Sequence, residues 1–287
     1  MSPNLTIGLP VRNTAPFLED ALRSILAQTF SDWELVAVDD GSADDSAGIL
    51  QRLKDPRVRV AVDGRHRGLG ARLNQIISLA AGKYIARMDA DDLMHPERLA
   101  RQIEFLGQHP DVDVAGCGLI SFDGRLRPMS VRRLPIEHDA IVSDPLSGIA
   151  VAHATAVARA EWWRKHPYNE SIRGCEDWEL WLASYRESRF ANLAETLYFY
   201  REEQGYSFRG YVRDKAELAS FLWRQQRRFG AAAALACAAQ WTRIAAYSVA
   251  HCVGADRMLV KRRGTRPTIS DTRLFEEAMT TISAVAL

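Results

Sequence analysis

The stretch that decides the fold is Tyr84-Ile85-Ala86-Arg87-Met88-Asp89-Ala90-Asp91-Asp92. It opens with an apolar run typical of a β-strand and ends with three carboxylates within four residues. Carboxylates this close repel one another unless a positive charge lies among them. Mg²⁺ and Mn²⁺ take hard oxygen ligands, and they are usually held by one or two carboxylates together with the phosphates of a substrate. The stretch therefore indicates either a metal and phosphate site or a solvated acidic turn that caps the next helix.

The chain before this stretch alternates between strand-like and helix-like patterns. Apolar, β-rich runs predict strands at Leu5 to Leu9, which Pro10 ends, at Leu35 to Val38, at Val58 to Val62 and at Tyr84 to Met88. Apolar residues at helical spacing predict helices at about 17–28, 47–53 and 73–81. Such alternation favours parallel βαβ units with helices on both faces of the sheet. We therefore expect an α/β fold with a mostly parallel sheet flanked by helices.

Polar side chains follow three of these four predicted strands at the point where each strand ends. The first strand is followed by Arg12 and Asn13, and the second by Asp39 and Asp40. The acids at 89–92 follow the fourth. Because ligands of open α/β sheets bind outside the carboxyl ends of the strands, these side chains are expected to converge on one edge. This placement favours the metal and phosphate interpretation of the acids.

Composition sets broad limits on the class of protein. The 287 residues are 47% hydrophobic and 25% charged, which is enough for one substantial core and a smaller appendage. The formal net charge of +1 gives no indication of a nucleic-acid partner. The four cysteines show neither C-x-x-C pairing nor zinc spacing, so they fit a reducing compartment. The N-terminus has no signal-peptide pattern, and we expect a cytoplasmic protein.

Five motifs follow one another in a specific order. They are Leu-Pro-Val-Arg-Asn (9–13), Gln-Thr-Phe-Ser-Asp-Trp-Glu-Leu (28–35), Val-Asp-Asp-Gly-Ser (38–42), Ala-Gly-Lys-Tyr-Ile-Ala-Arg-Met-Asp-Ala-Asp-Asp (81–92) and Glu-Asp-Trp-Glu-Leu-Trp-Leu (176–182). Together they resemble the family 2 glycosyltransferases over about residues 4–207. The resemblance implies the GT-A fold and an inverting enzyme that uses a nucleotide-diphosphate sugar. It divides a domain at 1–207 into a nucleotide-binding half at about 1–118 and an acceptor-binding half at about 119–207.

The resemblance implies a nucleotide site at the first two strand ends. Pro10 and Arg12 would lie along the nucleoside, and Asp40 would accept a hydrogen bond from uracil or a similar base. The alternative role of Asp40 is a helix N-cap. Arg72 and Asn74 stand where the family often carries an Ala-Arg-Asn element near the diphosphate, but here a leucine separates them and displaces the arginine.

For the acidic cluster, the resemblance implies that Asp91 is the principal metal ligand, with Asp89 near the ribose and the metal. Asp92 would either support these two groups or cap the helix expected near Pro96. Gln204 stands near the place of a histidine that can complete the metal shell in the family. Because an amide oxygen is a weaker ligand than imidazole for Mn²⁺, water molecules or a preference for Mg²⁺ are expected to compensate. The implied cofactor is thus Mn²⁺ or Mg²⁺.

On the acceptor side, the resemblance implies that Asp177 is the general base that deprotonates the attacking hydroxyl, with Glu176 and Trp178 beside the acceptor. The alternative is that both acids only favour the positive end of the helix that they open. His153 stands where the family often has a His-Pro-Thr-like element near the acceptor, although a histidine among small apolar residues is also typical of a packed core group.

The composition changes after residue 207, where we expect a basic helical extension at 208–287. Residues 208–270 contain twelve Lys and Arg against three Asp and Glu. The apolar stretch at 231–253 is interrupted by polar residues and falls short of a membrane span. The extension is expected either to pack on the catalytic domain with a solvated basic face or to contact anionic lipid at the inner face of the cytoplasmic membrane.

The resemblance implies an enzyme that moves one sugar, most simply from a UDP-sugar, to a hydroxyl of a glycan or lipid-linked acceptor in bacterial surface polysaccharide synthesis. The Gln-x-x-Arg-Trp motif of processive synthases is absent from the sequence, which favours a single transfer. One alternative is a sugar nucleotidyltransferase, but residues 10–16 contain none of the glycine and lysine of its phosphate loop. Another is a non-catalytic partner that binds nucleotide sugars.

Overall fold

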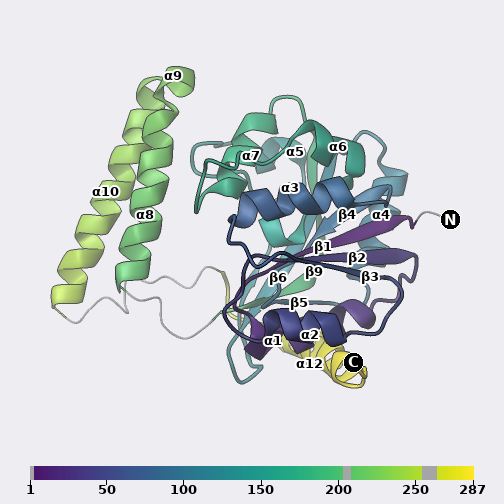
Figure 1. Cartoon of the computed structure of the whole chain (residues 1–287). Coiled ribbons are helices and arrows are strands. Elements are labelled where there is room, and N and C mark those ends of the chain that lie inside the picture. The colour runs from purple at the N-terminus through teal and green to yellow at the C-terminus, as the bar shows by residue number, and fades with distance from the viewer. Residues whose placement is uncertain (1–2, 203–207, 254–263) are drawn as a thin grey trace.

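The computed structural model describes residues 3–202, 208–253 and 264–287. A mixed sheet carries helices on both faces, and a helical hairpin stands at its side (Figure 1). The strands are β1 (Leu5–Val11), β2 (Trp33–Asp39), β3 (Val58–Val62), β4 (Tyr84–Arg87), β5 (Leu93–Met94), β6 (Val114–Phe122), β7 (Pro128–Arg132), β8 (Val157–Arg159) and β9 (Phe190–Arg201). The helices are α1 (Ala15–Leu26), α2 (Ser46–Arg52), α3 (Leu69–Leu79), α4 (Arg98–Gln108), α5 (His138–Ile141), the 3₁₀ turn η1 (His153–Thr155), α6 (Ala160–Lys165), α7 (Glu176–Ser184), α8 (Phe208–Arg224), α9 (Gln226–Phe229), α10 (Ala231–Cys252) and α12 (Ile269–Ser283).

The strands follow the order β3-β2-β1-β4-β8-β6-β9-β5, and β7 pairs with the outer part of β6. The first four strands are mutually parallel, which confirms the βαβ prediction. β8 runs antiparallel to both β4 and β6, and β5 runs antiparallel to β9. The sheet is therefore mostly parallel in its N-terminal half and mixed beyond β4.

The predicted strands and helices of the first half lie within four residues of the observed ones, and the largest difference is the start of α3 at Leu69. Pro10 was expected to end the first strand, but β1 continues to Val11. The ladder between β1 and β4 stops at the pair Gly8 and Arg87, whereas the ladder with β2 continues to Val11. Pro10 thus lies where its missing N–H deprives no partner strand of a hydrogen bond.

The parallel strands are buried on both faces. On β2, Leu35 and Ala37 belong to the hydrophobic cluster that includes α1, whereas Val36 and Val38 belong to the cluster beneath α3. Continuous apolar strands of this kind are expected where helices cover both sides of a sheet. The polar ends of these strands are consequently the part of the sheet left to bind ligands.

The segment after residue 207, expected as one extension, forms two separate parts in the described chain. α8 and α10 pair into a hairpin that shares a hydrophobic cluster with α7. α12 instead packs on the sheet, where the Phe275 ring lies 5.5 Å from Phe122 and 4.9 Å from Phe199 between ring centroids. In the described residues, no helix is long and apolar enough to cross a membrane.

Candidate active site

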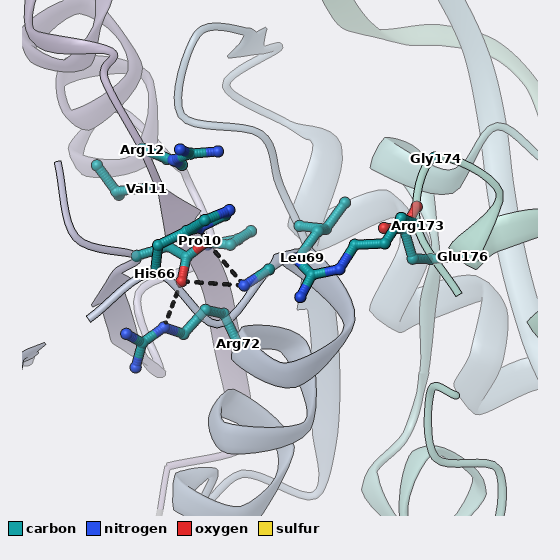
Figure 2. A pocket seen from close by; sticks show the side chains of 11 residues that line it. Pro10, Val11, Arg12, His66, Leu69, Arg72, Arg173, Gly174 and Glu176 are labelled. Atoms are coloured by element: carbon teal, nitrogen blue, oxygen red, sulfur yellow. Dashed lines mark hydrogen bonds and ion pairs between the residues drawn. The ribbon is translucent and has the colours of Figure 1, made fainter. Parts of the chain in front are cut away.

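A pocket of about 310 Å³ lies at the carboxyl ends of β1 and β2. Its walls come from both halves of the domain, and Figure 2 shows their side chains around the opening. The lining residues are Pro10, Val11, Arg12, Asp40, His66, Gly68, Leu69, Arg72, Arg173, Gly174 and Glu176. The structure thus brings together Pro10, Arg12 and Asp40, the three residues predicted for the nucleoside, and adds Glu176 from the start of α7.

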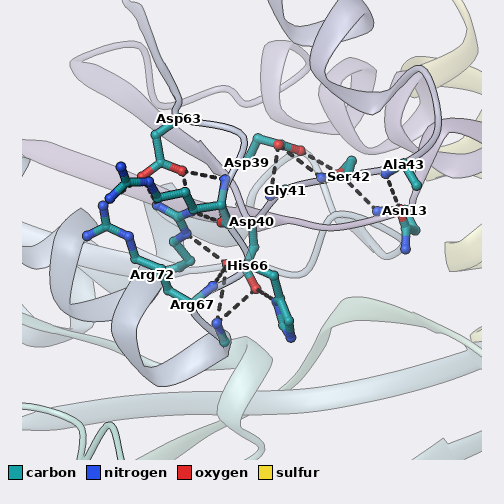
Figure 3. Close-up of polar contacts among 12 residues, drawn as sticks. Asn13, Asp39, Asp40, Gly41, Ser42, Ala43, Asp63, His66, Arg67 and Arg72 are labelled. Carbon is teal, nitrogen blue, oxygen red and sulfur yellow. Dashed lines mark hydrogen bonds and ion pairs between the residues drawn. The ribbon is translucent and has the colours of Figure 1, made fainter.

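Asp40 is fixed at the floor of this pocket by donors from the loop before α3 and from α3 itself (Figure 3). Its Oδ1 accepts hydrogen bonds from the backbone N–H of Arg67 at 2.7 Å and from Arg72 Nε at 2.9 Å. Its Oδ2 accepts from His66 Nδ1 at 2.7 Å and from the Gly68 N–H at 3.1 Å. Burial alone raises the pKa of Asp40, but these hydrogen bonds outweigh it and lower the pKa. Asp40 is therefore an ionised acceptor.

The N-cap alternative for Asp40 is wrong. α2 begins at Ser46 and is preceded by Asp45, five residues further along the chain than Asp40. The turn itself is held by Asp39, whose Oδ2 accepts from the N–H groups of Gly41 at 3.0 Å and Ser42 at 3.1 Å. Asp40 is thus not part of this turn, and its carboxylate takes its hydrogen bonds from residues 66–72 at the pocket.

Arg72, expected near the diphosphate, is a buried structural arginine that holds Asp40 in place. Its Nη1 donates to Asp63 at 3.1 Å and to Gln75 at 2.8 Å. Its Nη2 donates to Asp63 at 2.6 Å and to the carbonyl of Arg65. With Nε on Asp40, all five N–H groups of the guanidinium are engaged by protein acceptors. This geometry places Arg72 beneath the pocket and gives it no free donor for a phosphate.

Asn74 also contacts protein. Its side chain donates to the carbonyl of Tyr168 at 2.9 Å and accepts from the Tyr168 N–H at 2.9 Å. It also donates to Glu170 at 2.9 Å. Asn74 therefore ties α3 to the loop that precedes α7, and it positions that side of the pocket.

The three acids Asp89, Asp91 and Asp92 offer carboxylate oxygens that all lie within 4.8 Å of one another. Asp89 forms an ion pair with the buried Arg87 of β4. Asp92 is buried, and it accepts hydrogen bonds from the Tyr198 hydroxyl at 2.9 Å and from the Arg201 N–H at 2.7 Å. The cluster is thus assembled from the end of β4 and the facing strand β9.

The cluster carries more negative charge than its protein partners neutralise. Burial and the neighbouring Asp89 raise the pKa of Asp91 to about 6. Burial, Asp89 and Asp91 together raise the pKa of Asp92 well above its usual range. A divalent cation would relieve this repulsion, and carboxylate oxygen is the ligand type that Mg²⁺ and Mn²⁺ take.

The structure decides the alternative left open for Asp92. The next helix, α4, begins at Arg98 with Glu97 at its N-cap, and the short strand β5 lies between Asp92 and that helix. Asp92 is therefore no helix cap. Its hydrogen bonds to β9 make it the buried support of the cluster.

On the opposite wall, Glu176 and Asp177 form the first turn of α7, as predicted. Glu176 lines the pocket, while the half-buried Asp177 lies next to it in the chain. Burial raises the pKa of Asp177, and the positive charge of Arg87 acts in the opposite direction. A carboxylate with a raised pKa is suited to accept a proton. Trp178 packs in the cluster between α7 and the hairpin, and its ring lies against Gly148.

His153 lies in an aromatic group beneath this wall. Its Nε2 lies 2.6 Å from the Tyr168 hydroxyl, and its ring meets Trp181 edge to face at 5.9 Å between centroids. Burial, together with the charge of Arg87, lowers the pKa of His153 well below its usual value. His153 is thus a neutral group that packs against Tyr168 and Trp181 of α7.

Some residues of the site were not predicted from the sequence. Arg87 and Tyr198 hold the acidic cluster, and His66 and Arg173 line the pocket. Only Arg87 gave a signal in the sequence, because an arginine inside an apolar strand needs a buried partner. The role predicted for Gln204 concerns a residue outside the described ranges.

A polar pocket and an acidic cluster at the carboxyl ends of parallel strands are typical of enzymes that use nucleotide-linked substrates. Comparison with known proteins identifies the family. The family described as Glycosyl transferase family 2 matches residues 6–166. The chain is 33% identical over 209 residues to the Bacillus subtilis (strain 168) protein named "Putative glycosyltransferase EpsE", with 70% of this chain and 74% of that protein covered. The chain therefore belongs to glycosyl transferase family 2.

A second relative and a solved structure are also similar. The amylovoran biosynthesis glycosyltransferase AmsE of Erwinia amylovora is 32% identical over 176 residues, which cover 58% of this chain and 62% of AmsE. The mannosyltransferase PcManGT from Pyrobaculum calidifontis, solved in complex with GDP-Man and Mn²⁺, superposes with a TM-score of 0.62. Its sequence identity is 18%, and the match covers 99% of this chain and 86% of that chain. This likeness shows the GT-A fold.

Proposed function

We propose that the protein transfers one sugar, with inversion and in a metal-dependent reaction, from a nucleotide-diphosphate sugar to an acceptor hydroxyl. One observation carries the proposal: the pocket around Asp40, the cluster of Asp89, Asp91 and Asp92, and the α7 carboxylates lie at the same edge of the sheet. These are the three parts that such a transfer needs, namely a nucleoside site, a place for the diphosphate and a base.

The residues of the acidic cluster fit a divalent metal. Three carboxylates converge, the pKa values of Asp91 and Asp92 are raised, and Arg87 and Tyr198 already hold Asp89 and Asp92 in place. Asp91 and Asp89 would hold Mn²⁺ or Mg²⁺, while Asp92 would keep its hydrogen bonds to Tyr198 and Arg201 of β9. When bound, the metal neutralises the charge that accumulates on the leaving diphosphate.

Asp40 favours a nucleotide whose nucleobase carries an N–H donor, and UDP is the simplest candidate. The carboxylate of Asp40 is ionised and lines the pocket, where the imide N–H of uracil would donate to Oδ2 in place of the exposed His66 side chain. Pro10 lines the pocket beside it, and Arg12 offers an exposed guanidinium at the rim. PcManGT has a similar fold and was solved with GDP-Man, so GDP-sugars are tested beside UDP-sugars.

Asp177 would act as the general base. The acceptor hydroxyl attacks the anomeric carbon, the bond to the diphosphate oxygen breaks and its electron pair leaves with the nucleotide, and the proton passes to Asp177. Glu176 and Trp178 would border the acceptor, and His153 would hold this wall through Tyr168.

The name of AmsE supports a role in bacterial surface polysaccharide synthesis, with a glycan or lipid-linked acceptor. Such an enzyme would work in the cytoplasm, where nucleotide sugars are made, and at the inner face of the membrane if its acceptor is lipid-linked.

The proposal is tested by thermal unfolding with a panel of UDP-, GDP- and dTDP-sugars, each with and without Mn²⁺. A ligand that binds the folded state raises apparent stability by mass action, so one donor should raise the Tm only when the metal is present. Asp91→Asn should abolish this shift. Asp32→Asn, an exposed carboxylate next to the opposite end of β2, is the matched control and should leave it unchanged. A wild-type protein that no nucleotide sugar stabilises would overturn the proposal.

A further inference from the structure

The α8/α10 hairpin exposes an unusual amount of apolar surface. Of the large hydrophobic side chains that are exposed in the described chain, five of eleven lie between residues 208 and 253. They are Trp223 (60% exposed), Leu235 (72%), Trp241 (54%), Val249 (67%) and Val253 (72%). These include both exposed tryptophans of the described residues. Scattered single hydrophobic residues need no explanation, whereas a group on one element marks a contact surface.

The exposed residues of α10 cover about half of the helix surface, with Trp241 and Arg243 at the two edges of this exposed half. Leu235, Thr242 and Val249 recur every seven residues, and small residues, mainly alanines, fill the face between them. The opposite face is buried against α8 through Ala233, Cys237, Gln240, Ile244 and Tyr247. A helix that is apolar on both sides normally has a partner on each.

The same hairpin is strongly basic. Residues 208–253 contain seven Lys and Arg against two Asp and Glu. Arg209, Arg213 and Arg224 lie exposed along α8, and Arg227 lies exposed at the tip, in α9. Exposed aromatic side chains and arginines on one element are typical of proteins that bind a surface with an apolar interior and an anionic outer layer.

We infer that the α8/α10 hairpin docks the protein on the surface of an anionic lipid bilayer. A second copy of the chain is the other candidate occupant, but pairing two such hairpins would bring like charges together. A bilayer with anionic headgroups satisfies both features, because tryptophan settles at the level of the headgroups and arginine binds their phosphates. The hairpin would lie on the membrane surface, since α10 is too weakly apolar to span it.

The hairpin also borders the nucleotide pocket. The side chain of Glu217 on α8 packs against Gly174, which lines the pocket. Docking through this hairpin therefore places the pocket beside the lipid surface. This placement deepens the proposed function, on which it rests, by assigning the acceptor to the lipid-linked class.

The test is vesicle flotation with phosphatidylcholine vesicles that contain about 30% phosphatidylglycerol, compared with pure phosphatidylcholine. The protein should float only with the anionic vesicles, and less at high salt. Arg224→Gln/Arg227→Gln should weaken binding about 25-fold, which is fivefold for each arginine and corresponds to about 1 kcal/mol for each near an anionic surface. Trp223→Ser/Trp241→Ser should weaken binding as well.

Matched controls remove the same groups elsewhere on the surface. Lys54→Gln/Arg125→Gln removes two exposed charges, and Ile269→Ser removes a hydrophobic side chain that is 90% exposed. Both should float like the wild type. Equal flotation with neutral vesicles, no flotation, or an equal loss in the controls would overturn the inference. A concentration-dependent dimer that Trp223→Ser/Trp241→Ser disperses would assign the surface to a second copy instead.

The same variants are titrated with the nucleotide sugar and Mn²⁺ by calorimetry. A protein that binds the donor but ignores vesicles refutes the docking alone. A protein that floats but binds no donor refutes the proposed function and leaves the docking surface standing.

Discussion

Replacement of Arg72 distinguishes the role that the structure gives it from the phosphate role that the family resemblance implies. In the structure Arg72 is 1% exposed, and all its N–H groups donate to protein acceptors. One of these bonds runs from Nε to Asp40 at 2.9 Å. Arg72→Met keeps most of the side-chain volume and removes every hydrogen bond. We therefore expect Arg72→Met to lower mainly the free energy of unfolding, with a smaller effect on the affinity for the nucleotide sugar.

The magnitude follows from what the substitution leaves behind. Removal of one partner of a buried ion pair costs about 3–5 kcal/mol, because the other charge stays buried without compensation. Asp40 keeps its hydrogen bonds from His66, Arg67 and Gly68, so the lower end applies, and we expect a loss of about 3 kcal/mol. Asp40→Asn/Arg72→Met should cost less than the two single changes together, by about 1–2 kcal/mol, because the charge that Arg72→Met strands is then absent.

The assay is urea unfolding of the four proteins of this cycle, with the slope m checked for constancy. Arg52→Met is the matched control, since Arg52 forms an exposed ion pair with Asp45 at 2.8 Å and should lose at most about 1 kcal/mol. Donor affinity is measured on the same proteins by calorimetry. If Arg72→Met lost less than about 1 kcal/mol of stability while donor affinity collapsed, the guanidinium would act on the ligand and the reasoning here would be refuted.

Three further predictions concern the acceptor side and the acidic cluster. Asp177→Asn should lower kcat by about 10²–10⁴-fold with donor affinity retained in calorimetry. Because burial raises the pKa of Asp177, Asn should leave the Tm equal or higher, and unchanged transfer would exclude the base role. Tyr198→Phe removes the hydroxyl that donates to Asp92 and should cost about 1–3 kcal/mol in urea unfolding; a loss no greater than that of Tyr185→Phe, whose hydroxyl accepts an exposed hydrogen bond from Arg186, would contradict this. Burial lowers the folded-state pKa of His153, so the unfolded chain binds the extra proton below its ordinary pKa of about 6.5. Stability should therefore fall as pH drops below that value, by up to about 1.4 kcal/mol per pH unit, and His153→Gln should flatten this part of the pH profile.

The N-terminal half could be predicted closely because its signals are local. Apolar runs gave the strands, and each strand end carried its polar residues in the sequence itself, as at Asp40. The donors that fix Asp40 could not be foreseen, since His66 and Arg72 reach it from 26 and 32 residues away. The motif showed which acid faces the pocket, whereas only the packing of α3 shows what holds it.

The strands after β4 were not predicted, because their order depends on pairings between distant strands. β5 has two residues, too few for any periodicity, and it is defined by its pairing with β9 more than a hundred residues later. The basic composition of the tail suggested one extension. The apolar face of α12, which carries Phe275, instead returns that helix to the sheet.

The acidic cluster shows how the long-range contacts divide the roles of residues that the sequence presents as equivalent. Arg87 neutralises Asp89, and the Tyr198 hydroxyl and the Arg201 N–H occupy Asp92. In the described part of the chain, no side chain donates a hydrogen bond to Asp91, which is partly exposed. A cation in the cluster could therefore bind Asp91 without displacing a side-chain hydrogen bond. At Asp89 it would share the carboxylate with Arg87, whereas the carboxylate of Asp92 is already hydrogen-bonded to β9. The order of ligand strength, Asp91 before Asp89, thus follows from which carboxylates the protein has already used.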